Sequence, residues 1–555
     1  MTNAFPAFPL DHLPLRGAPD SPALRIKDRV YSYQTLNIRI GRLTKFLADQ
    51  GFVAGDRVAT WLPKTELACL MPLAAVRAGL VHVPVNPLLK PAQVRHILED
   101  SGARGLVTSA ARAGQLKSSH SLLGEGDRSA QPSGGGAASL AGALASAAPP
   151  SSTSAKAPAD ATSPSKLGED FRLLDDTELL SILDDETAGT FPPLPANTDT
   201  NTLAAILYTS GSTGRPKGVM LSHANLSLGA GSVAQYLGLA ADDVTLAVMP
   251  LSFDYGQNQL LSTWQAGGCV VPIDYLTPRE VIKACAKHAV TTLGCVPPLW
   301  VQLAEQNWPD EATANMRRLT NTGGALTPSL VKMLRSIFPH PTRIFAMYGL
   351  TEAFRSTYLD PDLIDANPTS IGKAIPFAEI LVVAKDGSEA KPNEHGELVH
   401  AGPLVAAGYW QDAERTAARF KPAPDWSRYG GMAVWSGDTI WRDEDGLLYF
   451  VGRDDAMIKT SGNRVSPTEV EEAAIESGLV AEACALGRKD ERLGEAIVLF
   501  VRALGAADEA ALAAHMKATL PNFMQPADYM WLEEFPKNAN GKLDRDGLKD
   551  RMPHV

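Results

Sequence analysis

The segment from Tyr208 to Val219 reads YTSGSTGRPKGV and follows an apolar stretch. Glycines with exposed N–H groups, side-chain hydroxyls and a lysine are the groups that a loop needs to hold triphosphate oxygens. The segment lacks the Gly-Lys-Ser/Thr ending of a Walker loop, and no G-x-G-x-x-G motif supports a dinucleotide fold. The alternative, a solvated Ser/Gly surface loop, fits twelve residues in this order poorly. The candidate phosphate ligands are Thr209, Ser210, Gly211, Ser212, Thr213, Gly214 and Lys217.

Five further short motifs follow the phosphate loop in the sequence. Together with that loop they closely resemble the motifs of the adenylate-forming superfamily, which includes acyl-CoA synthetases, peptide-synthetase adenylation domains and luciferases. The resemblance covers nearly the whole chain outside a Ser/Ala/Gly-rich segment. The motifs are Asn321-Thr322-Gly323-Gly324, Tyr348-Gly349-Leu350-Thr351-Glu352, Ser436-Gly437-Asp438, Gly452-Arg453-Asp454-Asp455 and Asn540-Gly541-Lys542.

The resemblance implies a role for each motif. Glu352 matches the glutamate that holds Mg²⁺, a hard cation that prefers carboxylate and phosphate oxygens. Thr351 matches a residue near the adenylate phosphate, and Asp438 and Arg453 match contacts to the ribose. Without the motifs, these residues would be interpreted as a helix-start glutamate and solvated loop charges. The resemblance also assigns Gly324, Tyr348 and Gly349 to the nucleotide site.

Lys542 matches the adenylation lysine, although a lysine near the end of a chain is ordinarily only solvated. When a carboxylate attacks the α-phosphorus of ATP, two anions meet, and a cation at that point helps the transition state most. A thiol then attacks the acyl carbon and releases AMP. In the family, a rotation of the small domain separates the two steps. Asp455 matches the hinge of that rotation, with Ala456 where a second acid is usual, and Ser461 and Gly462 match the thiol channel.

The acyl pocket implied by the resemblance contains Phe253, Asp254, Tyr255 and Gly323. Many acyl-CoA synthetases have an aromatic-histidine pair where this chain has Ser252-Phe253-Asp254. That sequence resembles the corresponding motif of amino-acid adenylation domains, in which the aspartate pairs with the α-ammonium of the substrate. Asp254 as a cap of the following helix is an equally weighted alternative, so the acid stays open among fatty, aryl and amino acids.

The expected activity is an AMP-forming acid–thiol ligase that uses ATP, Mg²⁺ and coenzyme A. Coenzyme A is favoured as acceptor because no carrier-protein domain follows in the chain. A freestanding amino-acid-activating enzyme that loads a carrier protein is the first alternative, motivated by Asp254. A catalytically inactive binding homologue is the second, and the joint presence of Lys217, Glu352, Asp438, Arg453 and Lys542 argues against it.

Composition excludes several other classes of protein. The 555 residues include 51 basic and 62 acidic side chains, a net charge of -11 that provides no basic field for nucleic acid. The N-terminus lacks a signal-peptide pattern. The apolar stretch 67–85 is interrupted by Pro72, Arg77, His82 and Pro84. This stretch therefore predicts a buried helix followed by a strand, not a transmembrane segment. Five scattered cysteines without a C-x-x-C motif fit a reducing cytoplasm and no structural zinc.

Alternating strand and helix patterns predict the elements that position these motifs. The pattern indicates a large α/β body over residues 1–452, with a flexible low-complexity insertion at about 109–165, and a small mobile α+β domain over 453–555. Of the thirty residues from Gln131 to Asp160, twenty-four are Ala, Gly, Ser or Pro. Ser466-Pro467-Thr468-Glu469 predicts a capping box at the start of a helix in the small domain. Strands are expected at 58–62, 81–85, 105–108, 203–207, 244–249, 268–273, 291–296 and 343–347.

Overall fold

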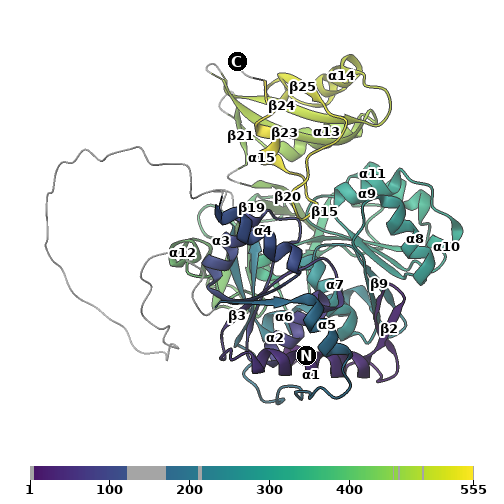
Figure 1. The fold of residues 1–555 in the computed structure, drawn as a ribbon. Helices are drawn as coiled ribbons and strands as arrows, with labels where there is room; N and C mark the ends of the chain where they lie inside the picture. Colours follow the sequence, from purple (N-terminus) through teal and green to yellow (C-terminus); the bar gives the residue numbers. More distant parts are fainter. Residues whose placement is uncertain are drawn as a thin grey trace, which may run out of the picture.

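The computed structural model describes residues 6–121, 171–209, 216–453, 456–460, 463–490 and 493–553. Within these ranges the chain forms two large sheets, flanked by helices, and a separate smaller sheet near the C-terminus (Figure 1). The fold is therefore of the α/β class, as the alternation of strands and helices predicts. Each predicted strand up to Tyr348 is present, and its ends lie within two residues of those expected.

The first large sheet has the strand order β6-β5-β3-β4-β7-β8, and all its neighbours are parallel except β7 and β8. Strand β7 runs directly into the phosphate loop, and β8 returns from it, so this hairpin fixes both ends of the loop. The strands are β3 (Arg57–Trp61), β4 (Val81–Pro84), β5 (Ala103–Thr108), β6 (Arg172–Asp175), β7 (Leu203–Thr209) and β8 (Lys217–Ser222).

The second large sheet joins a parallel half, β1-β10-β9-β11-β12-β13, to an antiparallel half that begins at β14. Its strands are β1 (Pro22–Ile26), β2 (Arg29–Ser32), β9 (Val244–Ala247), β10 (Cys269–Pro272), β11 (Thr292–Cys295), β12 (Arg318–Asn321), β13 (Arg343–Tyr348), β14 (Thr357–Tyr358), β15 (Ser370–Ala374), β16 (Glu379–Val383), β17 (Gly396–Ala401), β18 (Phe420–Pro422), β19 (Met432–Arg442) and β20 (Leu448–Arg453). The parallel half collects several motif residues at the carboxyl ends of its strands, which is where ligands of α/β sheets bind.

Helices cover both large sheets and supply most of their core. The stripe Leu36, Ile40, Leu43 and Leu47 is buried on α1, and the Ser32 hydroxyl accepts a hydrogen bond from Thr35 N at its start. The helices are η1 (Leu10–Leu15), α1 (Tyr33–Asp49), α2 (Glu66–Arg77), α3 (Pro91–Ser101), α4 (Ala110–Ser121), α5 (Asp176–Asp184), α6 (His223–Leu237), α7 (Asp254–Gln265), α8 (Pro278–His288), α9 (Pro297–Ala304), α10 (Asp310–Thr313), α11 (Pro328–Ile337), η2 (Thr351–Ala353) and α12 (Ala413–Arg419).

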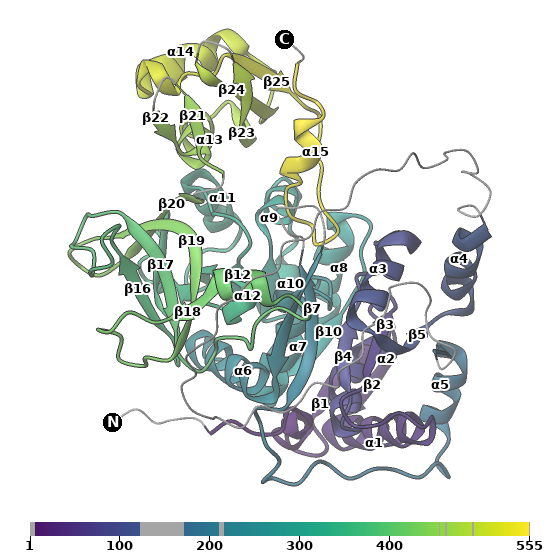
Figure 2. The same cartoon turned by 90° about the vertical axis from the view of Figure 1, so that its left-hand side faces the viewer.

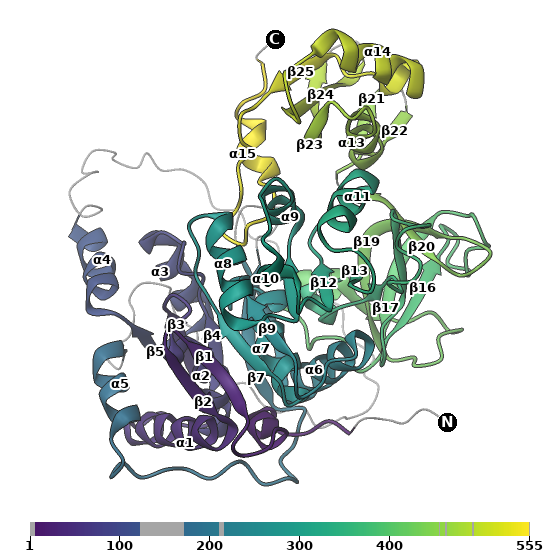
Figure 3. The same cartoon turned by 90° about the vertical axis from the view of Figure 1, so that its right-hand side faces the viewer.

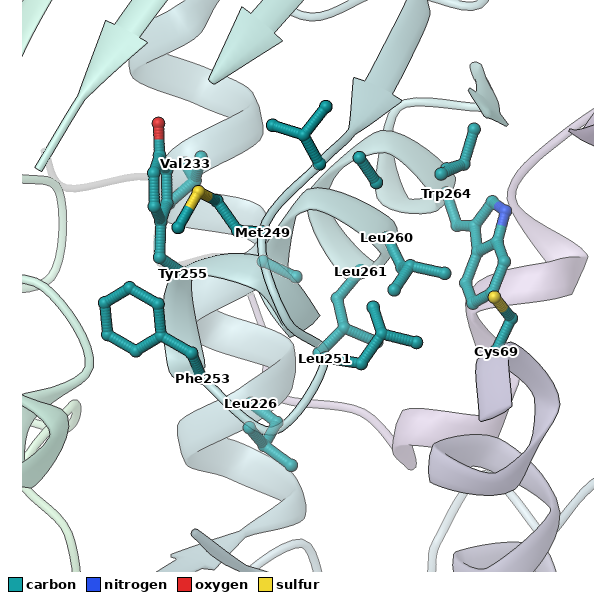
Figure 4. Close-up of a cluster of buried hydrophobic side chains, with 14 of the residues drawn as sticks. Cys69, Leu226, Val233, Met249, Leu251, Phe253, Tyr255, Leu260, Leu261 and Trp264 are labelled. Carbon is teal, nitrogen blue, oxygen red and sulfur yellow. The ribbon is translucent and has the colours of Figure 1, made fainter. Parts of the chain in front are cut away.

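Helix α7 lies in the centre of this core. Figure 4 shows its Trp264 side chain directed toward Cys69 of α2, while Tyr255 points to another side, toward Val233 of α6. Both sides of α7 are thereby packed, since Trp264 is fully buried and Tyr255 is 3% exposed. All five cysteines are free and buried, as expected for small core residues.

The last elements form their own sheet and core, seen in yellow and green in Figure 1. They are β21 (Ile458–Thr460), β22 (Asn463–Val465), α13 (Pro467–Glu476), β23 (Val480–Asp490), β24 (Gly494–Ala503), α14 (Glu509–Thr519), η3 (Asn522–Met524), β25 (Asp528–Trp531) and α15 (Arg545–Lys549). Figure 2 and Figure 3 show the chain just before α15 descending from this small domain toward α8 and α9 of the large body.

Two sequence predictions need correction. Residues from 109 onward were expected to leave the regular pattern, but α4 occupies Ala110–Ser121, because Leu116 is buried and the Arg112 guanidinium stacks on Trp61 at 4.8 Å. Residues 122–170, which hold most of the expected insertion, lie outside the described residues. The capping box is also wrong: α13 begins at Pro467 as predicted, but the Ser466 hydroxyl donates to the Val451 carbonyl of β20 and not to its own helix.

Candidate active site

Lys217, Glu352 and Tyr409 form one hydrogen-bonded cluster. Lys217 Nζ lies 2.8 Å from Glu352 Oε1 and 2.7 Å from the Tyr409 hydroxyl, and that hydroxyl donates to the same Oε1 at 2.6 Å. Burial by itself would raise the pKa of Glu352, but the Lys217 ammonium and the Tyr409 hydroxyl outweigh it and hold the pKa below its ordinary value. Glu352 is therefore a buried, ionised carboxylate next to Lys217, at the end of the phosphate loop.

Asp438, Tyr348 and Arg453 form a second polar cluster at the junction of the two halves of the large sheet. Asp438 and Arg453 are directly opposed on β19 and β20, and their side chains approach to 3.4 Å. The Tyr348 hydroxyl, at the end of β13, donates a hydrogen bond to Asp438 Oδ2. Burial, and then the Asp438 charge, raise the pKa of Tyr348 well above its usual range, so the phenol stays a donor.

Lys542 reaches the large body from the small domain. Its Nζ atom lies 4.3 Å from the centre of the Phe253 ring, a cation–π contact. Gly323 has a φ of +79°, and a Cβ atom at this position would lie 2.6 Å from Lys542 Cε, so the absence of a side chain there makes room for the lysine. Burial lowers the pKa of Lys542, while the Asp254 carboxylate acts in the opposite direction. In the described part of the chain, Lys542 makes no ion pair.

The turn that carries Lys542 is held at both of its sides. Within the turn, Lys542 N donates to Asn538 Oδ1 at 3.1 Å and Asn538 N donates to the Lys542 carbonyl at 2.7 Å. From the large body, Asn86 Nδ2 donates to the Ala539 carbonyl at 2.7 Å and to Asn540 Oδ1 at 3.0 Å. The turn is therefore fixed against the large body, with the lysine directed to Gly323 and Phe253.

Asp254 is not the cap of α7. The N-cap position belongs to Phe253, and Asp254 is the first residue inside the helix, 7% exposed. The Thr351 hydroxyl lies 3.5 Å from Asp254 Oδ1. Burial raises the pKa of Asp254, whereas the positive charges of Arg355 and Lys542 act against that shift. The interpretation of Asp254 as a helix cap is therefore wrong. The other interpretation, in which Asp254 is a carboxylate that faces the site, remains.

The structure brings most of the predicted residues together and leaves some untested. Thr209 is paired with Lys217 across β7 and β8, and its buried Oγ1 has no partner among the described residues. Gly324 is fixed beside Gly323, because its carbonyl accepts a hydrogen bond from Asn321 Nδ2. Gly349 directly follows Tyr348. The candidates outside the described residues are Ser210, Gly211, Ser212, Thr213, Gly214, Asp455, Ser461 and Gly462.

Three residues at the site escaped the sequence analysis: Tyr409, Asn86 and Arg355. Tyr409 is far from Glu352 in the sequence, and its neighbours Gly408 and Trp410 give no sign of the contact. Asn86 is the second residue after β4, and a polar residue at the carboxyl end of a parallel strand was a usable signal. Arg355 lies three residues after Glu352, and its closeness to that motif was also a usable signal.

Two protein-family descriptions match the chain. The family described as "AMP-binding enzyme" matches residues 14–410, and "AMP-binding enzyme C-terminal domain" matches residues 469–542. The chain belongs to the AMP-binding enzyme family. Of the helices in the described ranges, none is long and apolar enough to cross a membrane.

The relatives include a peptide synthetase and a coenzyme A ligase. One is the probable non-canonical nonribosomal peptide synthetase CymA of Salinispora arenicola, 29% identical over 96% of this chain, which itself spans only 6% of that protein's length. Another is the indoleacetate–CoA ligase of Aromatoleum aromaticum, 30% identical over 66% of this chain and 70% of the ligase. Among solved structures, ATP-bound MatB from Rhodopseudomonas palustris shares the fold, with a TM-score of 0.80, 23% identity and 98% of both chains covered.

Proposed function

We propose that this protein activates a carboxylic acid with MgATP as an acyl-adenylate and transfers the acyl group to the thiol of coenzyme A. The observation that carries the proposal is the position of Lys542, an ammonium held between Gly323 and the Phe253 ring. A half-buried cation without an ion-pair partner among the described residues is suited to stabilise negative charge that develops nearby. The membership of the family and the coenzyme A ligases among the relatives support the proposal.

The nucleotide would lie between the two polar clusters. Asp438 would accept hydrogen bonds from the ribose hydroxyls, and Arg453 would donate hydrogen bonds to the ribose. Both side chains can reach the same ligand because the two residues are paired on adjacent strands. Thr209 Oγ1, which has no partner in the described part of the chain, and Lys217 would face the phosphates, since they are the two ends of the phosphate loop. Gly324, Tyr348 and Gly349 line the same edge of the sheet.

The residues present fit a magnesium ion held jointly with ATP. Among the described residues no cluster of three His, Cys, Asp or Glu side chains occurs, so the protein offers Glu352 as a single hard ligand and the phosphate oxygens would supply others. Mg²⁺ would neutralise phosphate charge there. Glu352 is ionised and lies next to Lys217, whose ammonium would bind phosphate oxygens.

The chemistry then has two steps. An oxygen of the substrate carboxylate attacks the α-phosphorus, the bond from the α-phosphorus to the oxygen that bridges it to the β-phosphorus breaks, and pyrophosphate leaves. Lys542 would stabilise the charge on the bridging oxygens, and Thr351 would lie near the adenylate phosphate. In the second step a thiol sulfur attacks the acyl carbon and AMP leaves. Lys542 occupies the site in this arrangement of the domains, so the second step needs the small domain to move. The proposed hinge of this motion is Asp455. The thiol would then enter past Ser461 and Gly462.

Amino-acid activation is the second candidate, and Asp254 favours it. A buried carboxylate on the acyl side of the site is suited to hold a substrate ammonium. ATP–pyrophosphate exchange with panels of fatty, aryl, dicarboxylic and amino acids tests both candidates, followed by mass spectrometry of the thioester formed with coenzyme A or with a phosphopantetheinylated carrier protein. Exchange that requires an α-amino group and is lost in Asp254→Asn would replace the first candidate by the second. Absence of exchange with every acid would contradict both.

A further inference from the structure

Tyr409 joins the two charged groups of the first polar cluster. Its hydroxyl accepts a hydrogen bond from Lys217 Nζ at 2.7 Å and donates one to Glu352 Oε1 at 2.6 Å. The same Nζ atom lies 4.3 Å from the centre of the Tyr409 ring, a cation–π contact. One tyrosine therefore contacts both the proposed metal ligand and the proposed phosphate-binding lysine.

Both hydrogen bonds to the Glu352 carboxylate end on the same oxygen. Lys217 and Tyr409 donate to Oε1, whereas no other described residue donates a hydrogen bond to Oε2. Mg²⁺ prefers carboxylate oxygens, and an oxygen whose lone pairs meet no donor is available to bind it. The contacts of Tyr409 and Lys217 therefore leave Oε2 as the oxygen for a metal ion.

Tyr409 lies in a short segment that joins two of the motifs through its backbone. Ala406 N donates a hydrogen bond to the Glu352 carbonyl at 2.9 Å, and Trp410 N donates one to the Gly218 carbonyl of β8 at 2.8 Å. The segment therefore links Glu352 to the strand that returns from the phosphate loop. Because the backbone is held on both sides of Tyr409, the direction of its side chain is set by the fold.

The Tyr409 ring is also held in place. The residue is 4% exposed, and Phe420 of β18 packs edge-on against it with ring centres 5.4 Å apart. Tyr409 N donates a hydrogen bond to Thr416 Oγ1 of α12 at 2.9 Å. Gly408 permits this approach, because it has a φ of +125° and a Cβ there would lie 2.7 Å from Thr416 Cγ2. The Tyr409 hydroxyl is thus a preorganised group, suited to fix the side chains that it contacts.

We propose that Tyr409 is a positioning residue for MgATP: its hydroxyl holds Glu352 by Oε1, which keeps Oε2 available to Mg²⁺, and it holds Lys217 at the end of the phosphate loop. The inference rests on the MgATP binding in the proposed function. Tyr409 acts through these two side chains and not on the reacting atoms. A tyrosine that only filled the core would affect stability but not the dependence of nucleotide binding on Mg²⁺, so an experiment can separate the two roles.

Tyr409→Phe tests the inference because it deletes only the hydroxyl. The dissociation constant of α,β-methylene-ATP, which cannot be cleaved between the α- and β-phosphorus, is measured with EDTA and with saturating Mg²⁺. The ratio of the two constants is the Mg²⁺ dependence, and it is expected to fall about 10-fold in Tyr409→Phe, because hydrogen bonds to charged groups contribute more than neutral ones. In a Glu352→Gln background, Tyr409→Phe is expected to cause no further decrease, since the charged acceptor is already gone.

Tyr31→Phe is the matched control. Tyr31 is also buried, its hydroxyl donates to Glu66 Oε2 at 2.7 Å, and the Arg39 guanidinium lies 5.1 Å from the centre of its ring. This cluster joins β2, α1 and α2 and contains none of the motif residues. Tyr31→Phe should therefore lose stability in urea much as Tyr409→Phe does, while it retains the wild-type Mg²⁺ dependence.

An unchanged Mg²⁺ dependence in Tyr409→Phe, or an equal further decrease in the Glu352→Gln background, would overturn the inference and leave the proposed function standing. If Tyr409→Phe does not fold, 3-fluorotyrosine at position 409 keeps the hydroxyl and decides the question. Its fluorine resonance should shift when Mg²⁺ is added to the nucleotide complex, and an unshifted resonance would overturn the inference. Nucleotide binding without pyrophosphate exchange for any acid would remove only the proposed acid activation, whereas wild-type protein that binds no nucleotide would remove both.

Discussion

The side-chain amide of Asn86, at the end of β4, donates a 3.0 Å hydrogen bond to Asn540 Oδ1 in the turn that carries Lys542. A second bond from the same nitrogen reaches the Ala539 carbonyl at 2.7 Å. The ion pair between Arg502 and Glu305, 2.8 Å apart, joins the two domains at another point. Asn86 is therefore a positioning residue of the adenylating arrangement, since it fixes the turn and not the substrate.

Asn86→Ala should slow adenylation and spare the thiol step. Loss of two neutral hydrogen bonds, each worth about 1 kcal/mol, predicts a decrease of about 5–30-fold in pyrophosphate exchange. Thioester formation from a preformed acyl-adenylate is expected to keep its rate, because that step proceeds after the turn has left Asn86. Asn201→Ala removes an exposed asparagine and is the control. Equal losses of rate in adenylation and in thioester formation would show that Asn86 does not act by positioning the turn for adenylation.

Lys542→Ala should reduce adenylation far more strongly. Removal of one preorganised donor to a developing anion predicts a loss of about 10²–10³-fold in pyrophosphate exchange. The comparison variant is Lys549→Ala, because Lys549 lies in α15 on the same domain and its side chain is 58% exposed. Exchange at the wild-type rate in Lys542→Ala would refute the proposed role of this lysine.

Gly323→Ala should act through Lys542. The new methyl group would lie 2.6 Å from Lys542 Cε and would displace the ammonium, and a misplacement of about 1 Å predicts a loss of about 10–100-fold in exchange. Gly55→Ala separates this effect from backbone strain, because Gly55 has a φ of +87° and no atom within 4 Å of the added Cβ. Both variants should lose similar stability in urea, and only Gly323→Ala should lose exchange. Identical kinetics for the two would contradict the steric argument.

Glu352 should make stability depend on pH in the acid range. Lys217 and Tyr409 hold its pKa below the ordinary value of 4.5, so the unfolded chain binds this proton more readily than the folded protein does. The stabilisation is complete above pH 4.5 and is lost as the pH falls through the lowered pKa. Urea unfolding midpoints between about pH 3 and pH 6 should therefore change less steeply in Glu352→Gln than in wild type. The exposed control Glu186→Gln should keep the wild-type slope; the same slope in Glu352→Gln would rule out this linkage.

Local patterns predicted the elements well where one face of an element is apolar. The apolar residues of α1 recur at the spacing of a helix, and the apolar runs of the parallel strands are typical of buried strands. These patterns are local, so no distant contact was needed to predict these elements. The capping box at Ser466 was wrong because its hydroxyl had a competing acceptor, the Val451 carbonyl, which only the packing of α13 against β20 provides. Helix α4 was missed for a similar reason, since Leu116 and Arg112 gain their partners from elsewhere in the fold.

The sequence by itself determined the family, the order of the motifs and the residue types that can bind nucleotide, because these depend on short runs of neighbouring residues. Only the tertiary structure decided which side chains meet: Tyr409 with Glu352, Asn86 with Asn540, and Arg355 with the Tyr255 ring. The physical reason is that burial and pairing depend on contacts between distant segments.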